Sequence, residues 1–266
     1  MATDYSGYVD AGYLDTAAQM LSAAKQRTYE LMDVEAGHRV LDLGCGPGSD
    51  TIPLAGLVGD TGQVHGADFD PDMVEEANAR ARAAGLDQRV LHRHADAAAL
   101  PFDDDFFDAC RSERLFQHLP DPAAGLAEMI RVTAPGGRIV VLDTDYGSLS
   151  IGSTLPEVER RVAEHYCTMM NSPFAARALY RSFRAADLDD VSIEVVPLPV
   201  DDLDVFSQTF LLDRVLGEAE EAGVVTSDQS RRFRADLEQA SEIDGFFAAV
   251  QLLLVSGRKP DITTDI

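Results

Sequence analysis

The first 145 residues alternate between short apolar runs and longer segments in which apolar residues recur with a helical period. The apolar runs predict five β-strands, at Arg39–Leu43, Gln63–Ala67, Arg89–His94, Phe106–Arg111 and Arg138–Asp143, with a turn at Pro135–Gly137 before the last. The periodic segments predict helices at residues 10–33, Asp50–Val58, Pro71–Ala84 and Pro122–Val132. Strands separated by such helices imply right-handed βαβ units and a mostly parallel sheet covered on both faces.

After Asp145 the pattern changes, because helical segments dominate. Helices are predicted at Pro156–Met170, Pro173–Ala186, Leu203–Ala222 and Asp228–Ile243, and strands at Val191–Val196 and Phe246–Val255. Insertions that follow the carboxyl ends of parallel strands lie over the ligand crevice. We therefore expect a single α/β domain with an N-terminal helical cap (1–36), a Rossmann-like core (37–145) and a last part (146–266) that completes the sheet and forms a helical substrate lid.

Composition and charge narrow the class of protein. The chain of 266 residues is 45% hydrophobic, which is ordinary for a globular protein, and its formal net charge is −24. A field this negative repels nucleic acid and anionic membranes, so neither is an expected partner. Aspartate is abundant, and Lys25 and Lys259 are the only lysines among the 22 basic residues. This bias fits a salt-rich cytoplasm and a GC-rich codon usage equally well.

The cysteines and the hydropathy profile indicate a cytoplasmic protein. Cys45, Cys110 and Cys167 are too few and too scattered for a disulfide framework or a metal knuckle. No apolar run reaches the length needed to span a bilayer, and the N-terminus lacks the pattern of a signal peptide. His92 and His94 share one strand face but lack a third ligand, and Asp103–Asp105 is interpreted as a solvated turn. No metal site is expected.

The stretch Val40–Gly48 carries the first sign of a binding site, because a buried strand runs into glycines at positions 44, 46 and 48. Glycine permits a sharp turn and a close approach of ligand to backbone. The spacing departs from the dinucleotide fingerprint, since Ser49 stands where a glycine is expected, and Pro47 lacks an amide donor for a pyrophosphate. The loop fits a ligand without a diphosphate, and a nicotinamide dehydrogenase is disfavoured.

Two carboxylates follow the next strands. Asp68 ends the second strand about 20 residues past the glycine loop, where a carboxylate can accept both hydroxyls of a ribose. Asp96 follows the third strand, where it can accept from an adenine amino group. The alternatives are a helix cap for Asp68 and a plain turn residue for Asp96. A ribose site and an adenine site beside a phosphate-free glycine loop describe S-adenosylmethionine.

Residues 35–145 resemble the class I S-adenosylmethionine-dependent methyltransferases, within the small-molecule branch of ubiquinone/menaquinone-type and natural-product methyltransferases. The matching motifs are Val40–Gly48, Val64–Met73, Arg93–Pro101, Phe107–Pro122 and Pro135–Asp143. The resemblance implies a Rossmann-like, doubly wound, seven-stranded and mostly parallel sheet with helical lid insertions. Its last strand is antiparallel between its neighbours, and Phe246–Val255 is the candidate.

The resemblance also implies the cofactor contacts. The glycine loop lines the methionine end, Asp68 binds the ribose, and the remaining contacts flank the adenine, read its edge or lie beside the sulfonium. In these roles the resemblance places Gly44, Cys45, Gly46 and Gly48; Phe69 and Met73; Asp96 and Ala97; and Arg111 and Ser112. Arg27, on the preceding helix, is a candidate for the methionine carboxylate, with a solvated arginine as the alternative. Asp42 is a candidate for the methionine amine or a cap for loop amides.

Candidate residues for the chemistry lie near the expected acceptor. His118 follows the fourth strand and is a candidate general base, with a loop-ordering role as the alternative. His165 and Tyr166, on the first inserted helix, face either the acceptor or the lid packing. Tyr8 and Tyr13 lie on a segment that can fold over the cofactor.

The expected function is transfer of a methyl group from S-adenosylmethionine to an O, N or C atom of a small organic molecule, leaving S-adenosylhomocysteine. In-line displacement at a sulfonium needs alignment and dehydration but no nucleophilic triad. One alternative is an enzyme of this fold that binds the cofactor but catalyses a non-methylating step such as a cyclisation. A cofactor-bound scaffold or sensor is a third interpretation. A monomer or a homodimer is expected.

Overall fold

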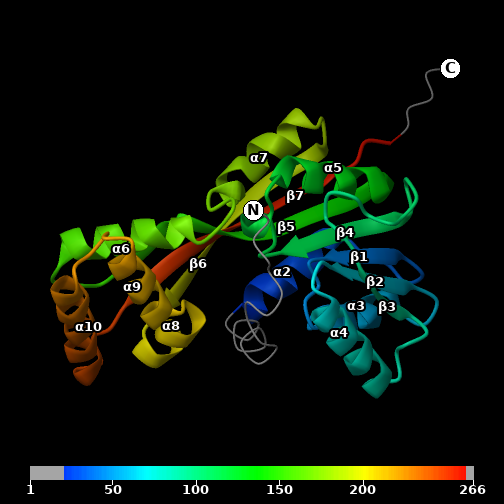
Figure 1. Ribbon diagram of the computed structural model, residues 1–266. Coiled ribbons are helices and arrows are strands. Elements are labelled where there is room, and N and C mark those ends of the chain that lie inside the picture. The colour runs from blue at the N-terminus through cyan, green and yellow to red at the C-terminus, as the bar shows by residue number, and fades with distance from the viewer. Residues whose placement is uncertain (1–20, 262–266) are drawn as a thin grey trace.

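The computed structural model describes residues 21–261, which form a seven-stranded sheet in the order β3-β2-β1-β4-β5-β7-β6 (Figure 1). The strands are β1 (Arg39–Leu43), β2 (Gln63–Asp68), β3 (Val90–His94), β4 (Phe107–Glu113), β5 (Thr133–Ile151), β6 (Asp189–Val200) and β7 (Ala248–Arg258). β1 to β5 pair in parallel, whereas β7 is antiparallel to both β5 and β6. The predicted fold class is confirmed, including the antiparallel last strand.

Helices cover both faces of this sheet (Figure 1). α2 (Ser22–Met32), α3 (Thr51–Val58) and α4 (Pro71–Ala83) share one apolar core beneath the sheet, and α5 (Pro122–Val132) and α7 (Ala175–Ala185) share another on the opposite face. Because both faces are buried, the central strands are mostly apolar, as in β1, where Asp42 is the one charged residue within Val40–Leu43. The helices predicted to begin at residues 50 and 71 begin at Thr51 and Pro71 in the structure.

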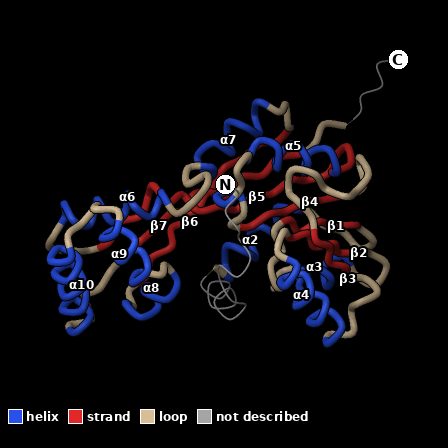
Figure 2. Tube along the Cα trace, in the orientation of Figure 1, coloured by secondary structure: helices blue, strands red, loops and turns tan. Residues whose placement is uncertain are grey.

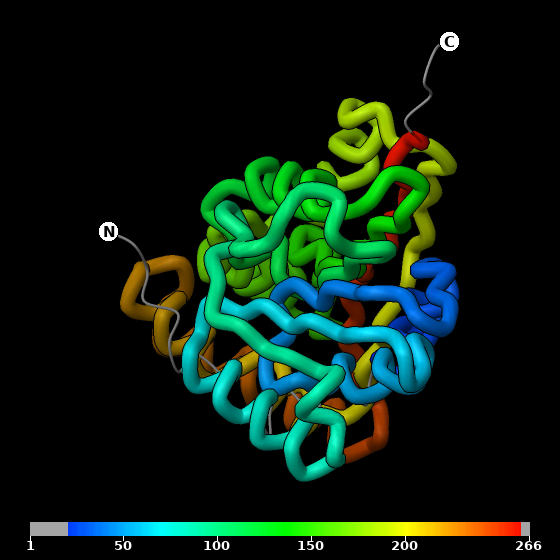
Figure 3. Tube along the Cα trace, turned by 90° about the vertical axis from the view of Figure 1, so that its right-hand side faces the viewer, coloured from blue at the N-terminus to red at the C-terminus, as the bar shows by residue number. Residues whose placement is uncertain are grey.

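A second lobe is built on the far ends of the last three strands. β5, β6 and β7 extend past the other strands and carry α6 (Pro156–Thr168), α8 (Leu203–Thr209), α9 (Leu212–Glu221) and α10 (Ser227–Glu242) (Figure 2). This lobe has its own apolar core, which includes Leu149, Val162, Phe206, Val215 and Phe233. Seen from the side, α10 lies behind the parallel strands (Figure 3). Among residues 21–261 no helix is long and apolar enough to cross a bilayer.

Most predicted bounds shift by at most four residues, and three differences from the prediction are larger. The helix expected over Leu203–Ala222 is two helices, because Leu211 adopts a left-handed backbone with φ 51° and separates α8 from α9. β5 runs from residue 133 to residue 151, past the expected end at Asp143, since its polar second half pairs with β7 across a register shift. The expected turn at Pro135–Gly137 falls within β5 as an irregularity in which Gly136 has φ 77°. The part of the 10–33 helix before residue 21 lies outside the described residues.

Local side-chain chemistry fixes several helix starts. Asp70 precedes α4 and accepts the amide hydrogen of Asp72, while Pro71 supplies a preset φ in the first turn. Asp121 caps α5 in the same way, with Pro122 following. Two Asp-Pro pairs therefore begin the helices that lead away from the sheet at the edge where the strands end.

Candidate active site

A cavity of about 1170 Å³ lies at the carboxyl ends of β1, β2 and β4 and continues under the second lobe. It is larger than most small-molecule sites, which occupy roughly 300–1,000 Å³. The glycine loop, Asp68 and Asp96 line one half, as predicted for a ligand at the strand ends. Residues of β7 and of the helices of the second lobe line the other half. The volume therefore accommodates two molecules side by side.

The glycine loop curls over the end of β1. The amides of Gly44 and Cys45 both donate to the carbonyl of Ala67 on β2, at 2.7 and 3.1 Å. Gly44 has φ 74°, and a Cβ there would lie 3.0 Å from Leu115, so only glycine fits. Gly44, Cys45 and Gly46 line the cavity. Gly48 instead faces the packed layer below, toward Ala77, Thr51 and His92.

Asp68 ties the loop to the end of β2. Its Oδ2 accepts the amide hydrogen of Gly46 at 2.8 Å, and its Oδ1 accepts that of Asp70 at 2.9 Å. Burial raises the pKa of Asp68 above its usual range, although these amide bonds favour the ionised form. Each oxygen has a second lone pair beyond these amide bonds, and Asp68 lines the cavity. The geometry suits a carboxylate that accepts two neighbouring hydroxyls.

The predicted adenine residues surround the next part of the cavity. Phe69 is 58% exposed and its ring lies 5.6 Å from the ring of His94, so an apolar platform stands open at the mouth. Met73 and Ala97 line the cavity beside it. Asp96 accepts the amide hydrogen of Ala98 at 2.9 Å in a tight turn after β3. The structure brings all these residues together with the glycine loop.

Arg111 and Ser112 do not line the cavity, which corrects their predicted place beside the sulfonium. Both are fully buried beneath it, because they lie within β4 and pair with Asp42 and Leu43 of the neighbouring strand β1. The Arg111 guanidinium forms ion pairs at 3.0 Å with Asp42, 3.2 Å with Asp50 and 2.9 Å with Glu113. These three carboxylates do line the cavity, so Arg111 acts on it through them.

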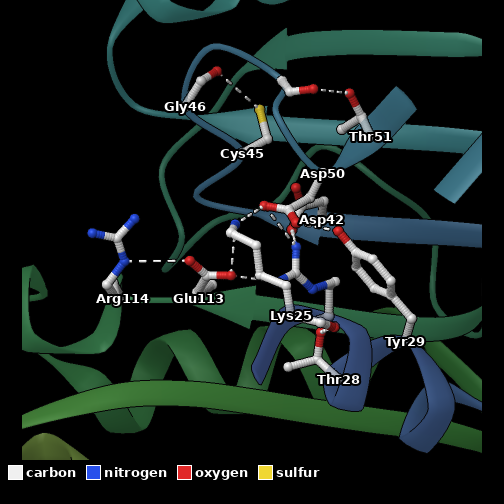
Figure 4. A network of polar contacts seen from close by, with 12 residues as sticks. Lys25, Thr28, Tyr29, Asp42, Cys45, Gly46, Asp50, Thr51, Glu113 and Arg114 are labelled. Atoms are coloured by element: carbon white, nitrogen blue, oxygen red, sulfur yellow. Dashed lines mark hydrogen bonds and ion pairs between the residues drawn. The ribbon is translucent and has the colours of Figure 1, made fainter. Parts of the chain in front are cut away.

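Lys25 lines the cavity, although the sequence analysis did not assign it to the site. Its Nζ lies 2.5 Å from Asp50 and 2.8 Å from Glu113 (Figure 4). Because Arg111 pairs with the same two carboxylates, two cations and two carboxylates close a ring. Tyr29 donates a hydrogen bond to Asp50 as well. Lys25 is 8% exposed and lines the cavity. Its place on the apolar side of the predicted N-terminal helix was the available signal.

Arg27, the predicted carboxylate ligand, lies elsewhere. It is exposed, and its guanidinium pairs with Glu194 of β6 at 2.7 Å and with Glu30 at 2.9 Å. Two positions along α2 rotate a side chain by about 200°, so Arg27 and Lys25 point to opposite sides of the helix. The prediction for Arg27 is therefore corrected, and Lys25 holds the position at the cavity.

The charges around Arg111 shift the pKa values of the neighbouring carboxyl groups in different directions. Burial raises the pKa of Asp42 to about 7 despite the neighbouring Arg111. Burial acts on Asp50 too, but Arg111 and Lys25 outweigh it and hold the pKa of Asp50 below its usual range. Near neutral pH the ring therefore has two cations and two carboxylates, and Asp42 lies beside it as a carboxyl that ionises readily. Such a site accommodates an additional positive charge.

A short helix presents His118 to the cavity. The turn η1 (Phe116–His118) is fixed by Asp143 of β5, which accepts the amide hydrogens of Phe116 at 2.7 Å and Gln117 at 3.3 Å. Burial and then the charge of Arg114 lower the pKa of His118 to about 4, so its imidazole is neutral at physiological pH. Gln117 Nε2 lies 3.0 Å from His118 Nε2. Both side chains line the cavity.

The two candidates on α6 differ in position. Tyr166 lines the cavity and is 2% exposed, with its ring 6.4 Å from that of Phe210. His165 is buried next to Thr168, with 3.4 Å between its Nδ1 and the threonine Oγ1, and it does not line the cavity. The expectation that His165 faces the acceptor is therefore wrong, because neighbouring helical positions differ by 100°. Tyr8 and Tyr13 lie outside the described residues.

The remaining polar candidates have structural contacts. His92 Nε2 lies 2.9 Å from Thr51 Oγ1 beneath the glycine loop. In the acidic turn, Asp104 and Asp105 pair with basic residues, Arg131 at 2.7 Å and Lys259 at 2.6 Å, so the turn is not simply solvated. Within residues 21–261 no three His, Cys, Asp or Glu side chains are grouped so that they could hold a metal ion.

Comparison with known proteins identifies the family of the chain. Residues 40–137 match the family model described as a methyltransferase domain. The chain is 38% identical over 126 residues to a demethylmenaquinone methyltransferase of Bacillus cytotoxicus, a match that covers 47% of this chain and 53% of that protein. The chain thus spans about half the length of that relative. A 37.1 kDa protein encoded in a transposon of Streptomyces fradiae is 34% identical over 255 residues, covering 92% of this chain and 70% of that protein.

A solved structure shows the same fold. The geranyl diphosphate C-methyltransferase of Streptomyces coelicolor, crystallised with S-adenosylhomocysteine, superposes with a TM-score of 0.56 at 18% identity, over 90% of this chain and 76% of that one. The sheet order, the glycine loop after β1 and the family match agree with one another. The chain therefore belongs to the class I S-adenosylmethionine-dependent methyltransferases.

Proposed function

We propose that this protein moves a methyl group from S-adenosylmethionine to an O, N or C atom of a small organic molecule by in-line displacement. The observation that carries the proposal is one cavity in which the glycine loop, Asp68 and Asp96 adjoin an apolar compartment under the second lobe. The bound cofactor supplies an electrophilic methyl group on a positively charged sulfur. The protein then has to align the acceptor and exclude water.

The residues present fit the cofactor. Gly44 lines the cavity and has no side chain, so its backbone can be approached closely by a ligand. Asp68 would accept the two ribose hydroxyls, and Asp96 would accept from the adenine amino group. Phe69 and Met73 would flank the adenine ring. These assignments require only hydrogen-bond acceptors and apolar surfaces, which are the groups found there.

The methionine end would contact the charged ring. We assign its carboxylate to Lys25, whose ammonium has three donors and faces two carboxylates. The ammonium group of the cofactor's methionine end would face Asp42, because a nearby cation favours the deprotonated form of this carboxyl. Arg111 holds the carboxylates Asp42, Asp50 and Glu113 in place beneath the cavity.

We assign proton removal from the acceptor to His118. Its imidazole is neutral at physiological pH, lines the cavity, and lies on a turn fixed by Asp143. A neutral imidazole accepts the proton of an acceptor hydroxyl or amine as the new bond forms, and releases it to solvent afterwards. We further propose a cytoplasmic monomer or homodimer, which is consistent with the three free cysteines, Cys45, Cys110 and Cys167.

The test uses S-adenosylmethionine with a labelled methyl group and a metabolite mixture. The proposal predicts that S-adenosylhomocysteine accumulates and that the label appears in a small organic product. Release of S-adenosylhomocysteine without a labelled product would indicate hydrolysis only. If the cofactor binds but no S-adenosylhomocysteine forms, while an unlabelled molecule is rearranged, the protein is a non-methylating enzyme of this fold, such as a cyclase.

A further inference from the structure

Two residues of the cavity wall have a backbone conformation that is rare for their type. Seven non-glycine residues within 21–261 have a positive φ, and five of them are aspartates, which tolerate the left-handed region. The other two are Arg114, with φ 50°, and Leu211, with φ 51°, and both line the cavity. Strained residues of this kind cluster at binding and active sites, where the surrounding structure holds them in place. Arg114, which is charged, is therefore a candidate for a role in the site.

The Arg114 side chain presents two terminal nitrogens to the cavity. Its Nε lies 3.3 Å from Oε1 of Glu113, and the described part of the chain contains no other hydrogen bond or ion pair of this side chain. The terminal nitrogens point away from Glu113 (Figure 4). The side chain is 21% exposed and lines the cavity, and neither terminal nitrogen is among the buried polar atoms without a partner. Both nitrogens are therefore accessible to a ligand.

Arg114 is also the cation that remains for the acceptor. The lysine and arginine side chains among the described lining residues are Lys25 and Arg114. Lys25 contacts the carboxylate of the cofactor in the proposed function, and Arg111 lies beneath the cavity without exposed surface. An anionic group on the acceptor would therefore meet Arg114.

The candidate base His118 lies close to Arg114. It follows Arg114 by four residues, at the end of η1, and both side chains line the cavity. Burial, and then the charge of Arg114, lower the pKa of His118 to about 4, and such an effect of charge requires that the two side chains are near each other. One acceptor can therefore contact Arg114 with an anionic group and His118 with an O–H or N–H group.

Beyond these two residues the acceptor half of the cavity is largely apolar. Met169, Met170, Leu198 and Leu211 line it, and all four are partly exposed. They come from the segment after α6, from β6 and from the joint between α8 and α9. Apolar ligand surface that packs against them is removed from water, which favours binding. An acceptor that fits this half has an apolar body beside its anionic group.

We propose that the methyl acceptor is an amphipathic carboxylic acid whose carboxylate is bound by Arg114. The inference rests on the proposed function and specifies its substrate class. A guanidinium has parallel N–H donors that match a planar carboxylate, and one guanidinium balances one negative charge. A phosphate monoester bears up to two charges, which a single arginine does not balance in a chain of net charge −24.

The chemistry takes place at a second group of the same molecule. Its O–H or N–H lies at His118, which takes the proton as the bond from oxygen or nitrogen to CH₃ forms. The S–CH₃ bond breaks in the same step, and its electron pair stays on sulfur. The carboxylate of the acceptor keeps its charge throughout, so Arg114 holds the molecule from binding to release.

Three naphthalenes that differ in one group test the proposal on protein saturated with S-adenosylhomocysteine. 2-Naphthoate is a carboxylate, 2-naphthamide is its neutral counterpart, and 2-naphthyl phosphate bears the larger charge. By calorimetry at pH 7 we expect 2-naphthoate to bind at least about fivefold more tightly than either of the others. The proposal is overturned if one of the others binds as tightly or more tightly, or if 2-naphthoate does not bind.

A matched pair of variants assigns the effect to Arg114. Arg114→Gln should weaken 2-naphthoate by about tenfold to a hundredfold, the value of a hydrogen bond between charged groups, and leave 2-naphthamide unchanged. In Arg177 the guanidinium also pairs with a carboxylate through Nε, that of Asp145, but it does not line the cavity. Arg177→Gln should therefore bind both ligands as the wild type does. Equal losses for the two ligands in Arg114→Gln would contradict the proposal.

A third variant separates ligand binding from a structural role. Glycine adopts the left-handed backbone without strain, so Arg114→Gly should keep the melting temperature of the wild type and bind 2-naphthoate as weakly as Arg114→Gln. A lower melting temperature with an unchanged affinity for 2-naphthoate would mean that Arg114 only holds Glu113, which overturns the proposal. Failure of S-adenosylhomocysteine to bind the wild type would instead contradict the proposed function.

Discussion

At the scale of single residues, the most informative feature is the ring formed by Lys25, Asp50, Glu113 and Arg111. Burying four charges is costly unless each is surrounded by opposite charge, and removal of one partner leaves the others uncompensated. Arg111 has no exposed surface, so without its carboxylates its guanidinium would be an uncompensated buried charge. The ring is therefore a fixed electrostatic floor below the methionine end of the proposed cofactor site.

Lys25→Met should weaken S-adenosylmethionine binding by about tenfold to a hundredfold, the value of a hydrogen bond between charged groups. The matched control is Arg27→Met, which removes a cation from the same helix but from its exposed side. Its dissociation constant should match that of the wild type. Titration calorimetry at low temperature compares the three proteins. Equal losses in the two variants would mean that only the total charge of the helix matters.

The pKa of Asp42 makes stability depend on pH. Burial raises this pKa to about 7 in the folded state, above the value of about 3.9 in an unfolded chain. The folded state therefore retains the proton more tightly, and the stability that this provides is lost as pH rises toward and past 7. Asp42→Asn cannot ionise. Its melting temperature should rise relative to the wild type between pH 5 and pH 8.

Scanning calorimetry at several pH values measures that difference, in which the contribution of Asp143, also buried with a pKa raised to about 7, cancels. Saturating S-adenosylmethionine should reduce the advantage of Asp42→Asn at pH 8, because the ligand's positive charge stabilises the carboxylate. A difference in melting temperature that stays constant from pH 5 to pH 8 would contradict the assignment.

At the scale of elements, the strands and helices of the core could be predicted because their periods and end signals are local. Asp70 and Pro71 mark the start of α4, and the predicted bounds of α5 are those observed. The second half of β5 could not be predicted, since its polar residues pair with a strand about a hundred positions away, as Ser150 does with Ala249. The break at Leu211 depends on tertiary packing and left no signal in the helical period.

The position of a candidate site residue could be predicted where it depends only on the end of a strand, and not where it depends on how elements pack. Asp68, Asp96 and the glycine loop end strands, so their position followed from the sheet alone. Which of Lys25 and Arg27 faces the cavity depends on how α2 is rotated about its axis against the sheet. The hydrophobic period predicts this rotation only if the buried side of the helix is assumed to include a charged residue, Lys25. Arg111 can be buried because three carboxylates surround it: Asp42 of β1, Asp50 just before α3, and Glu113 of β4.

Replacing glycine by alanine is expected to have opposite effects on stability in helix α9 and in strand β2. Gly217 lies on the exposed side of α9, where an added Cβ meets nothing within 4 Å, so Gly217→Ala should stabilise the protein by about 0.5–1 kcal/mol. Gly66 lies inside β2, where a Cβ would be 2.5 Å from His92 and 2.8 Å from Cys45. Gly66→Ala should cost about 1–3 kcal/mol and weaken cofactor binding, because Cys45 belongs to the glycine loop.

Urea unfolding of both variants provides the free energies, and calorimetry of Gly66→Ala provides the affinity. The account would be contradicted if Gly66→Ala retained wild-type stability and affinity, since the loop would then not be packed against β2 as described. A loss of stability in Gly217→Ala would show that α9 is not an exposed helix at this position.

At the scale of the whole molecule, the charge of −24 acts on folding as a repulsion that salt screens. The melting temperature should therefore rise between 0.02 and 0.5 M KCl, as followed by circular dichroism. A further rise above 1 M KCl would favour adaptation to a salt-rich cytoplasm, whereas a plateau would favour codon usage as the origin of the arginine bias. A flat or falling curve from the lowest salt would contradict the role of repulsion.

The two lobes of the molecule meet at one cavity, and the central claim is that its first half binds S-adenosylmethionine through Asp68. Titration calorimetry of this cofactor into the wild type, Asp68→Ala and Asp72→Ala tests the claim most directly. Asp72 is a nearby exposed carboxylate on α4 that does not line the cavity. We predict binding of one equivalent to the wild type and to Asp72→Ala, and at least tenfold weaker binding to Asp68→Ala. No heat with the wild type, or an unchanged affinity in Asp68→Ala, would contradict the account.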